Sequence, residues 1–380
     1  MSRCHVSKTD AAHFIQQCME AAGSNTAHAK ALAEVLVEGD YRGHFSHGLN
    51  RLDMYVKDIQ SGICSAQGEP LVEKETAATA LVDGRNLLGP VVGNFCMDLA
   101  IQKAREAGIG WVVAKGSNHY GIAGFYSMQA LKHGMIGMSF TNTSPLVVPT
   151  RAKECTLGTN PLSVAAPAAN GDSFVLDMAT SSVALGKVEL YARNNEKVPY
   201  GWGCDHQGKV TENPEEVLDG GGLLSLGGSE LTGGYKGYGL SMMVEIFCGI
   251  LAGAAYSKNV RTWRVTDRVA NLGQCFVAIN PNCFAPGFET RVSDLLQIHR
   301  NLEPVLLHTH THTHTHTGGG GGGGGDTHTH THTHTHTHTH THTHTHTHTP
   351  FTYLLLLWEG QCKHLIQIQS EFAIYFYQRE

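Results

Sequence analysis

The sequence predicts an α+β fold in which helices flank a mixed β-sheet. Amphipathic helical segments occupy residues 8–62, and short β-rich runs then alternate with helical ones from about residue 75 to 290. No GxGxxG sequence connects a predicted strand to a predicted helix, and neither GxxxxGKS nor GxxxxGKT occurs. A standard dinucleotide cradle and a P-loop are therefore not predicted. The order of elements leaves the strand order open.

The N-terminal part predicts a helical module, which we place over residues 1–74. Apolar residues recur at three- and four-residue spacing through residues 8–39, where Gly23 and Gly39 are expected to end two helices. A third amphipathic segment, SHGLNRLDMYVKDIQSG, begins at Ser46 and ends at Gly62. Together these segments form the predicted module.

A mixed domain is predicted over residues 75–303. Its strand-like runs are TALVDG, IGWVVAKG, IGMSFTNTS, SVAAPA and SFVLDMA, with helical segments around NFCMDLAIQKAREAG and FYSMQALKHG between them. The glycine-heavy stretch 219–239 predicts a loop that leads into the helix GLSMMVEIFCGILAG.

Charge and composition exclude several classes of partner. The net charge is −6, and both nucleic acid and an anionic membrane would require a basic patch. No window reaches the roughly 18 apolar residues that a membrane-spanning helix needs. The ten cysteines are scattered without a CxxC pair, as is typical of reduced thiols. We therefore expect a cytoplasmic protein without nucleic-acid or membrane partners.

The composition changes abruptly after Pro304. Thr-His alternation, eight consecutive glycines and further Thr-His alternation continue as far as Thr349. Because this tract has almost no apolar side chains to bury, residues 304–350 are expected to be disordered. A CA dinucleotide repeat encodes alternating His and Thr in every frame, so translated non-coding repeat is one explanation. Metal binding by clustered imidazoles is the alternative. Residues 351–380 form a separate tail.

The first candidate site is Ser46-His47-Gly48-Leu49-Asn50-Arg51. On a helix, His47 and Arg51 share a face, as does Tyr55. Reduction of a 2-oxoacid needs a proton donor for the carbonyl oxygen and a cation for the carboxylate, and this face offers both. If Ser46 caps the helix, the helix dipole favours a neutral His47. The alternative is the solvated face of an amphipathic helix.

Three further segments are weaker candidates. His119 follows a strand-like run, where ligand sites often form, although a loop histidine bonded to backbone fits equally well. Asp177 ends SFVLDMATSS and either orients an imidazole or caps the next helix. Residues 234–239 include Lys236 and precede a predicted helix. They are expected either to bind a phosphate at the helix start or to form a flexible glycine loop. Residues 142–145 and 159–161 are expected to be turns.

Seven segments, in this order, resemble the type-2 malate/L-lactate dehydrogenase family, whose relatives include sulfolactate, ureidoglycolate, diketogulonate and piperideine-carboxylate oxidoreductases. The resemblance runs from about residue 8 to 303. It is carried by YRGHFSHGLNR, GIGWVVAKGSNHYGIAG, TNTSP, AKECTLGTNPLSVAAPA, FVLDMATS, GWGCDHQGKVTENP and GGYKGYGLSMMVE.

The resemblance implies a non-Rossmann fold of the L-sulfolactate dehydrogenase-like type, with a mostly antiparallel central sheet, flanking helices and active sites arranged in a homodimer. It implies His47 as the catalytic acid or base, with Asp177 as its partner, Arg51 as the carboxylate anchor, and Ser46 and His119 near the substrate. The implied cofactor is NAD or NADP, and no metal ligand is assigned. The implied cofactor-binding residues are Ser173, Phe174, Val175, Leu176, Asp177, Met178, Ala179, Tyr235 and Lys236.

The implied reaction transfers a hydride between NAD(P) and C2 of a 2-hydroxyacid or 2-oxoacid, such as malate or lactate. This chain departs from the family after the NLEP sequence at 301–304, where the repeat replaces a segment that completes the cofactor site in relatives. The competing hypothesis is therefore a truncated, inactive product that retains only dimerisation or ligand binding.

Overall fold

The structure of this protein is a computed structural model that describes residues 6–262, 265, 268–303 and 373–377. The low-complexity tract expected over residues 304–350 lies outside the described residues. The same holds for the tail over 351–380, apart from one strand at 373–377.

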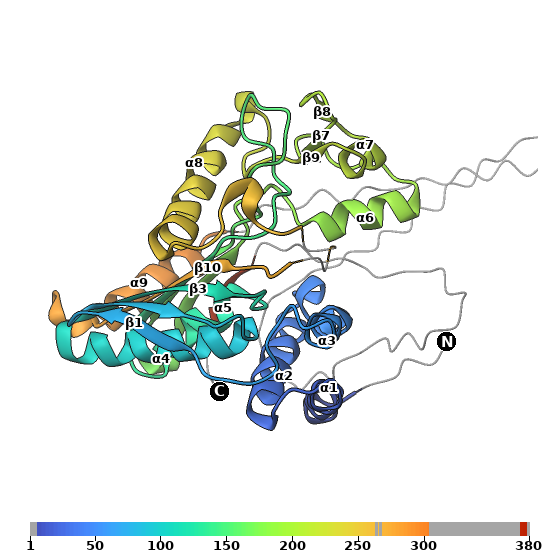
Figure 1. The fold of residues 1–380 in the computed structure, drawn as a ribbon. Helices are drawn as coiled ribbons and strands as arrows, with labels where there is room; N and C mark the ends of the chain where they lie inside the picture. Colours follow the sequence, from blue (N-terminus) through green and yellow to red (C-terminus); the bar gives the residue numbers. More distant parts are fainter. Residues whose placement is uncertain (1–5, 263–264, 266–267, 304–372, 378–380) are drawn as a thin grey trace, which may run out of the picture.

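The expected central sheet is confirmed, and it is mostly antiparallel (Figure 1). Its strands are β1 (Leu71–Glu75), β2 (Thr79–Asp83), β3 (Ile109–Ser117), β4 (Ile136–Thr141), β5 (Leu162–Pro167), β6 (Ser173–Met178), β10 (Leu272–Ile279) and β11 (Ala373–Tyr377). Within the described residues their spatial order is β1-β2-β3-β10-β4-β5-β6-β11, and β2–β3 is the parallel pair among them.

The helices flank this sheet, as the α+β class requires. They are α1 (Lys8–Ala21), α2 (Thr26–Tyr41), α3 (Leu52–Gln60), α4 (Gly89–Ala107), α5 (Ala123–Leu131), α6 (Leu185–Asn194), α7 (Pro214–Leu218), α8 (Gly234–Glu245) and α9 (Phe288–Arg300). Three irregular turns matter below: the 3-10 turns η1 (Phe45–His47) and η2 (Leu49–Arg51), and the π turn η5 (Ile246–Ile250).

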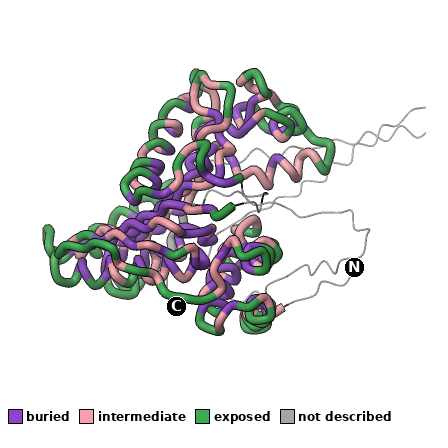
Figure 2. Tube along the Cα trace, in the orientation of Figure 1, coloured by how far each residue is buried: buried purple, intermediate pink, exposed green. Residues whose placement is uncertain are grey.

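The sheet is covered on both faces, so its central strands are mostly apolar. Val112 of β3 and Phe276 of β10 point to the side that packs against α4 and α5. Val113 and Val277 point to the opposite side, against α8 and η5. Figure 2 shows the buried residues gathered in these strands. Because β10 is buried on both faces it lacks an alternating pattern, which explains why the sequence analysis did not identify it.

The N-terminal helices pack as a cluster through Ile15, Leu32, Leu36 and Tyr55. The expectation that Gly39 ends the second helix is wrong, because α2 continues to Tyr41. Gly39 is needed for a different reason: a Cβ there would lie 2.9 Å from the carbonyl oxygen of His47. The last turn of α2 therefore supports the segment that carries His47.

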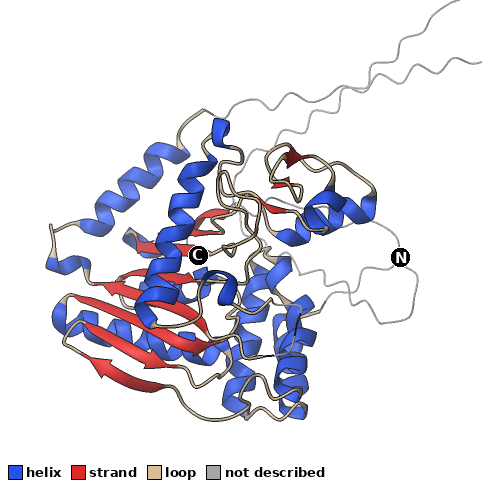
Figure 3. Cartoon of the chain, turned by 45° about the horizontal axis from the view of Figure 1, so that its top comes forward, coloured by secondary structure: helices blue, strands red, loops and turns tan. Residues whose placement is uncertain are grey.

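A second, small sheet stands apart from the central one (Figure 3). It consists of β7 (Gly203–Cys204), β8 (Val210–Thr211) and β9 (Gly222–Leu223), in the order β8-β7-β9. Val188 of α6, Val217 of α7 and Leu223 share one apolar cluster with it. This unit places the start of α6 opposite the N-terminal helices.

The edge of the central sheet next to β6 is formed by β11, which pairs antiparallel with all of Ser173–Asp177. This part of the C-terminal tail is therefore a strand. None of the described helices has the length and apolarity that crossing a membrane would demand.

Candidate active site

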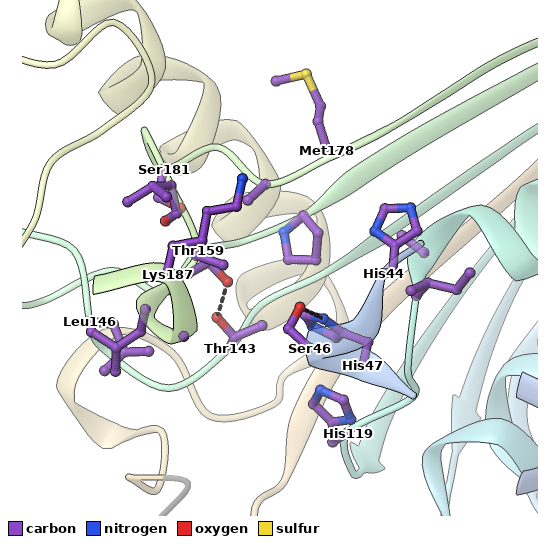
Figure 4. Close-up of a pocket in the computed structure, with 18 of the residues that line it drawn as sticks. His44, Ser46, His47, His119, Thr143, Leu146, Thr159, Met178, Ser181 and Lys187 are labelled. Atoms are coloured by element: carbon purple, nitrogen blue, oxygen red, sulfur yellow. Dashed lines mark hydrogen bonds between the residues drawn. The ribbon is translucent and has the colours of Figure 1, made fainter. Parts of the chain in front are cut away.

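A pocket of about 350 Å³ lies between the N-terminal helices, the end of β4, the residues just before β5, the end of β6 and the start of α6. His47, Arg51 and His119 line one side of it, and Ser181 and Lys187 line another. Figure 4 shows His44, Ser46 and His47 facing the cavity, with Lys187 across from them and Thr143 and Thr159 between. The leading sequence candidates therefore meet in one cavity.

The segment that carries His47 and Arg51 is shaped by Asp40 of α2. Its Oδ2 atom accepts a hydrogen bond from the backbone N–H of Leu49 at 2.8 Å. The carboxylate sits so close to Gly48 that any Cβ there would collide with it. Gly48 is therefore required where the chain bends between the two 3-10 turns η1 and η2.

The predicted helix from Ser46 is wrong, because α3 starts only at Leu52 and two 3-10 turns precede it. Ser46 is not a helix cap. Its hydroxyl contacts Nδ1 of His47 at 2.8 Å, and its carbonyl oxygen accepts a hydrogen bond from Nε of Arg51 at 2.5 Å. Ser46 thus links the imidazole and the guanidinium directly, which the helical spacing did not predict.

His47 is half-buried, and its surroundings favour the neutral imidazole. Burial lowers the pKa of His47 well below its ordinary value, and His119 and Arg51 lower it further. A neutral His47 was expected, but the cause is desolvation and nearby positive groups, not a helix dipole.

His119 stacks on His47, with ring centroids 5.5 Å apart. Its Nδ1 accepts hydrogen bonds from the Tyr55 hydroxyl at 2.5 Å and from the N–H of Gly121 at 3.3 Å. Because Nδ1 is an acceptor, the neutral ring carries its proton on Nε2. Burial, with a smaller effect of Arg51, lowers the pKa of His119 to about 4.

Asp177 lines the same pocket as His47, and its carboxylate is held by a backbone group. Its Oδ2 atom accepts a hydrogen bond from the N–H of Gly124, at the start of α5, at 2.8 Å. A Cβ on Gly124 would lie 2.6 Å from that oxygen, so the contact requires glycine. Burial raises the pKa of Asp177 to about 7. Asp177 therefore ties the end of β6 to α5.

The predicted cofactor residues are divided by the structure. Asp177, Met178 and Ala179 line the pocket. The preceding residues of β6, which are Ser173, Phe174, Val175 and Leu176, run back between β5 and β11. Tyr235 and Lys236 are exposed at the start of α8 and are not among the residues that line the pocket.

Several pocket residues were missed by the sequence analysis. His44, Thr143, Thr159 and Lys187 all line the cavity. The two threonines belong to TNTSP and GTNP, which were expected to form turns and which carry part of the family resemblance, but neither threonine was assigned to the site. Lys187 is the third residue of α6 and had no signal beyond its charge. In the part of the chain that the structure describes, no carboxylate forms an ion pair with Lys187.

The comparisons with known proteins agree with this fold and pocket. A family model described as malate/L-lactate dehydrogenase matches residues 6–315. The chain is 44% identical over 299 residues to a malate dehydrogenase of Pyrococcus abyssi, which covers 78% of this chain and 82% of the relative. It is 33% identical over 281 residues to a ureidoglycolate dehydrogenase (NAD(+)) of Escherichia coli, which covers 74% and 78%.

A solved structure of sulfolactate dehydrogenase from Methanocaldococcus jannaschii matches with a TM-score of 0.74 and 36% identity, and the match covers 80% of this chain and 86% of that one. The family model spans most of the chain, both curated relatives are over 30% identical to it across the aligned residues, and the fold agrees. This chain therefore belongs to the malate/L-lactate dehydrogenase family.

Proposed function

We propose that this chain is an NAD(P)-dependent dehydrogenase that oxidises a 2-hydroxyacid, or reduces the matching 2-oxoacid, at C2. The observation that carries the proposal is that His47 and Arg51 line one pocket and are joined through Ser46. An acid or base and a carboxylate-binding cation are the two groups that this chemistry requires.

Arg51 binds the substrate carboxylate in this proposal. Its Nε atom is held by the Ser46 carbonyl oxygen, which fixes the plane of the guanidinium relative to His47. A planar, oriented guanidinium suits a carboxylate better than a mobile ammonium does, because it donates two parallel hydrogen bonds.

His47 takes the hydroxyl proton during oxidation and returns it during reduction. Its lowered pKa keeps the imidazole neutral at neutral pH, as a base requires. An anionic substrate would raise that pKa by adding negative charge beside the ring. The Nε2–H of His119 is available to hold the substrate oxygen, because its Nδ1 is engaged by Tyr55.

The pocket also fits a nicotinamide ring. Met178, Ala179 and Val183 give it an apolar wall beside the polar groups around His47. When bound, the nicotinamide supplies or receives the hydride. We propose that NAD or NADP binds against this wall and that the cofactor-binding residues include the rest of Ser173–Ala179, with Tyr235 and Lys236 near the cofactor phosphates. We propose a homodimer as the working form.

Lys187 favours a substrate with a second negative charge, such as malate over lactate. A half-buried cation in a pocket is stabilised when a ligand brings the opposite charge. The relatives include proteins named malate dehydrogenase and L-sulfolactate dehydrogenase, and malate and sulfolactate each have two anionic groups.

The test is oxidation of NADH or NADPH by the purified full chain with a panel of 2-oxoacids. We expect oxidation above background that is lost in His47→Asn. No oxidation with any pair would overturn the proposal and support the inactive, truncated product.

A further inference from the structure

Two loops of the pocket wall converge on one buried carboxylate outside the pocket. Glu245, the last residue of α8, is 4% exposed. Its Oε1 accepts hydrogen bonds from the N–H of Ser257 at 2.7 Å and from Nδ2 of Asn142 at 3.3 Å. Its Oε2 accepts one from Nδ2 of Asn160 at 2.8 Å. All three donors are neutral.

Asn142 and Asn160 are each adjacent in sequence to a threonine that lines the pocket. Asn142 is followed by Thr143, and Asn160 is preceded by Thr159. The loops also bond to each other: Oδ1 of Asn160 accepts from the N–H of Thr143 at 3.1 Å, and the two threonine hydroxyls are 3.4 Å apart. Figure 4 shows these hydroxyls facing each other at the cavity. Glu245 therefore holds both asparagines from behind the wall.

The packing leaves these loops little freedom. A Cβ on Gly158 would lie 2.6 Å from Oδ1 of Asn160, and one on Gly249 would lie 2.9 Å from Nδ2 of Asn142. Asn160 itself has a φ of +36°, which residues other than Gly, Asn and Asp rarely adopt. The π turn η5 begins directly after Glu245 and contains Gly249. Such turns are frequent at functional sites.

A carboxylate suits this position because its oxygens only accept hydrogen bonds. Glutamine has nearly the same shape, but its NH2 group would face one or more of the three donors. Those donors would then lose their hydrogen-bond acceptor. Position 245 therefore favours glutamate over glutamine, although the two side chains differ only in one oxygen that is replaced by an NH2 group.

We propose that Glu245 is a positioning residue for the active site: acting through Asn142 and Asn160, it fixes Thr143 and Thr159 against the substrate without touching it. The kinetic part rests on the proposed dehydrogenase function, whereas the loop geometry does not. Two readouts on the full chain separate them.

The first readout is hydrogen exchange of backbone amides in peptides that cover 141–146 and 157–162. In Glu245→Gln we expect faster exchange in both peptides. The double variant Glu245→Gln with Asn160→Asp restores an acceptor opposite the new donor. It also removes the hydrogen bond that Nδ2 of Asn160 donates to the carbonyl oxygen of Ser241 at 3.3 Å, so protection should return in part. Lys103→Met is the control, because it removes buried hydrogen bonds of α4 to Glu75 and Thr76, beside the opposite edge of the sheet. It should leave both peptides unchanged.

The second readout is steady-state kinetics, with each variant assayed at a temperature the same number of degrees below its own Tm. We expect Glu245→Gln to raise the KM for the 2-oxoacid about 10-fold, with a smaller change in the cofactor KM, and the double variant to recover part of the loss. Unchanged exchange in both peptides, or the same KM as in the Lys103→Met control, would overturn the proposal. An inactive wild-type chain whose exchange responds as described would overturn the dehydrogenase function alone.

Discussion

The segment around His47 and the start of α8 looked alike in sequence, yet only the first lines the pocket. Both were predicted to open a helix, and each carries one cation, Arg51 or Lys236. In the structure Arg51 lines the cavity, whereas Lys236 lies on an exposed helix start.

The difference lies in what packs behind each segment. Asp40 and Gly39 of α2 support the first segment, and His119 stacks on its imidazole. The start of α8 has no side-chain cap and leaves Tyr235 52% exposed. A pattern of residue types becomes a site where a second element holds it and removes water.

The largest effect is expected for Arg51→Lys, which tests the contrast at the segment that lines the pocket. A lysine keeps the charge but loses the planar fork and the bond to the Ser46 carbonyl. We expect kcat/KM for the 2-oxoacid to fall on the order of 100-fold. Steady-state kinetics would show it, with the exposed Arg193→Lys as the control. Equal kinetics in the two variants would remove Arg51 from the site.

Burial at the pocket also predicts a pH effect through Asp177→Asn. The pKa of Asp177 is raised from 3.8 to about 7, so between these values the folded chain keeps a proton that the unfolded chain has released. The wild type therefore loses stability as pH rises through that window, and the Asn variant does not. We expect the variant to gain roughly 3 kcal/mol relative to wild type between pH 4.5 and 7.5. Urea unfolding at both pH values measures this, and a constant difference would contradict it.

The opposite wall of the pocket is tested by Lys187→Met. If this lysine holds a second anionic group, kcat/KM for oxaloacetate should fall roughly 10-fold, while that for pyruvate changes by less than about 2-fold. Kinetics with both substrates decide this. A parallel loss for the two acids would point to the cofactor phosphate instead.

The smallest effect is expected for Lys236→Ala. An exposed lysine near a phosphate contributes about 0.5 to 1 kcal/mol, so the cofactor KM should rise about 2- to 5-fold while the 2-oxoacid KM stays constant. A cofactor KM identical to that of wild type would leave the start of α8 outside the cofactor site.

The sequence by itself determined the elements whose signal is local. Strands such as β3, helices such as α4 and the neighbouring residues Ser46, His47 and Arg51 were all predicted from short patterns, and seven ordered segments gave the family. The central strand β10 was not identified because it is buried on both faces, so it has no alternating period, and Gln274 interrupts its apolar run.

Only the tertiary structure decided how these pieces cooperate. The stacking of His119 on His47 and the bond from Gly124 to Asp177 join residues at least 53 positions apart. The hydrogen bonds from Asn142 and Asn160 to Glu245 join residues at least 85 positions apart. Such contacts depend on which elements the sheet brings together, and burial then sets the charge states of the groups. Neither effect leaves a mark in the local order of residues.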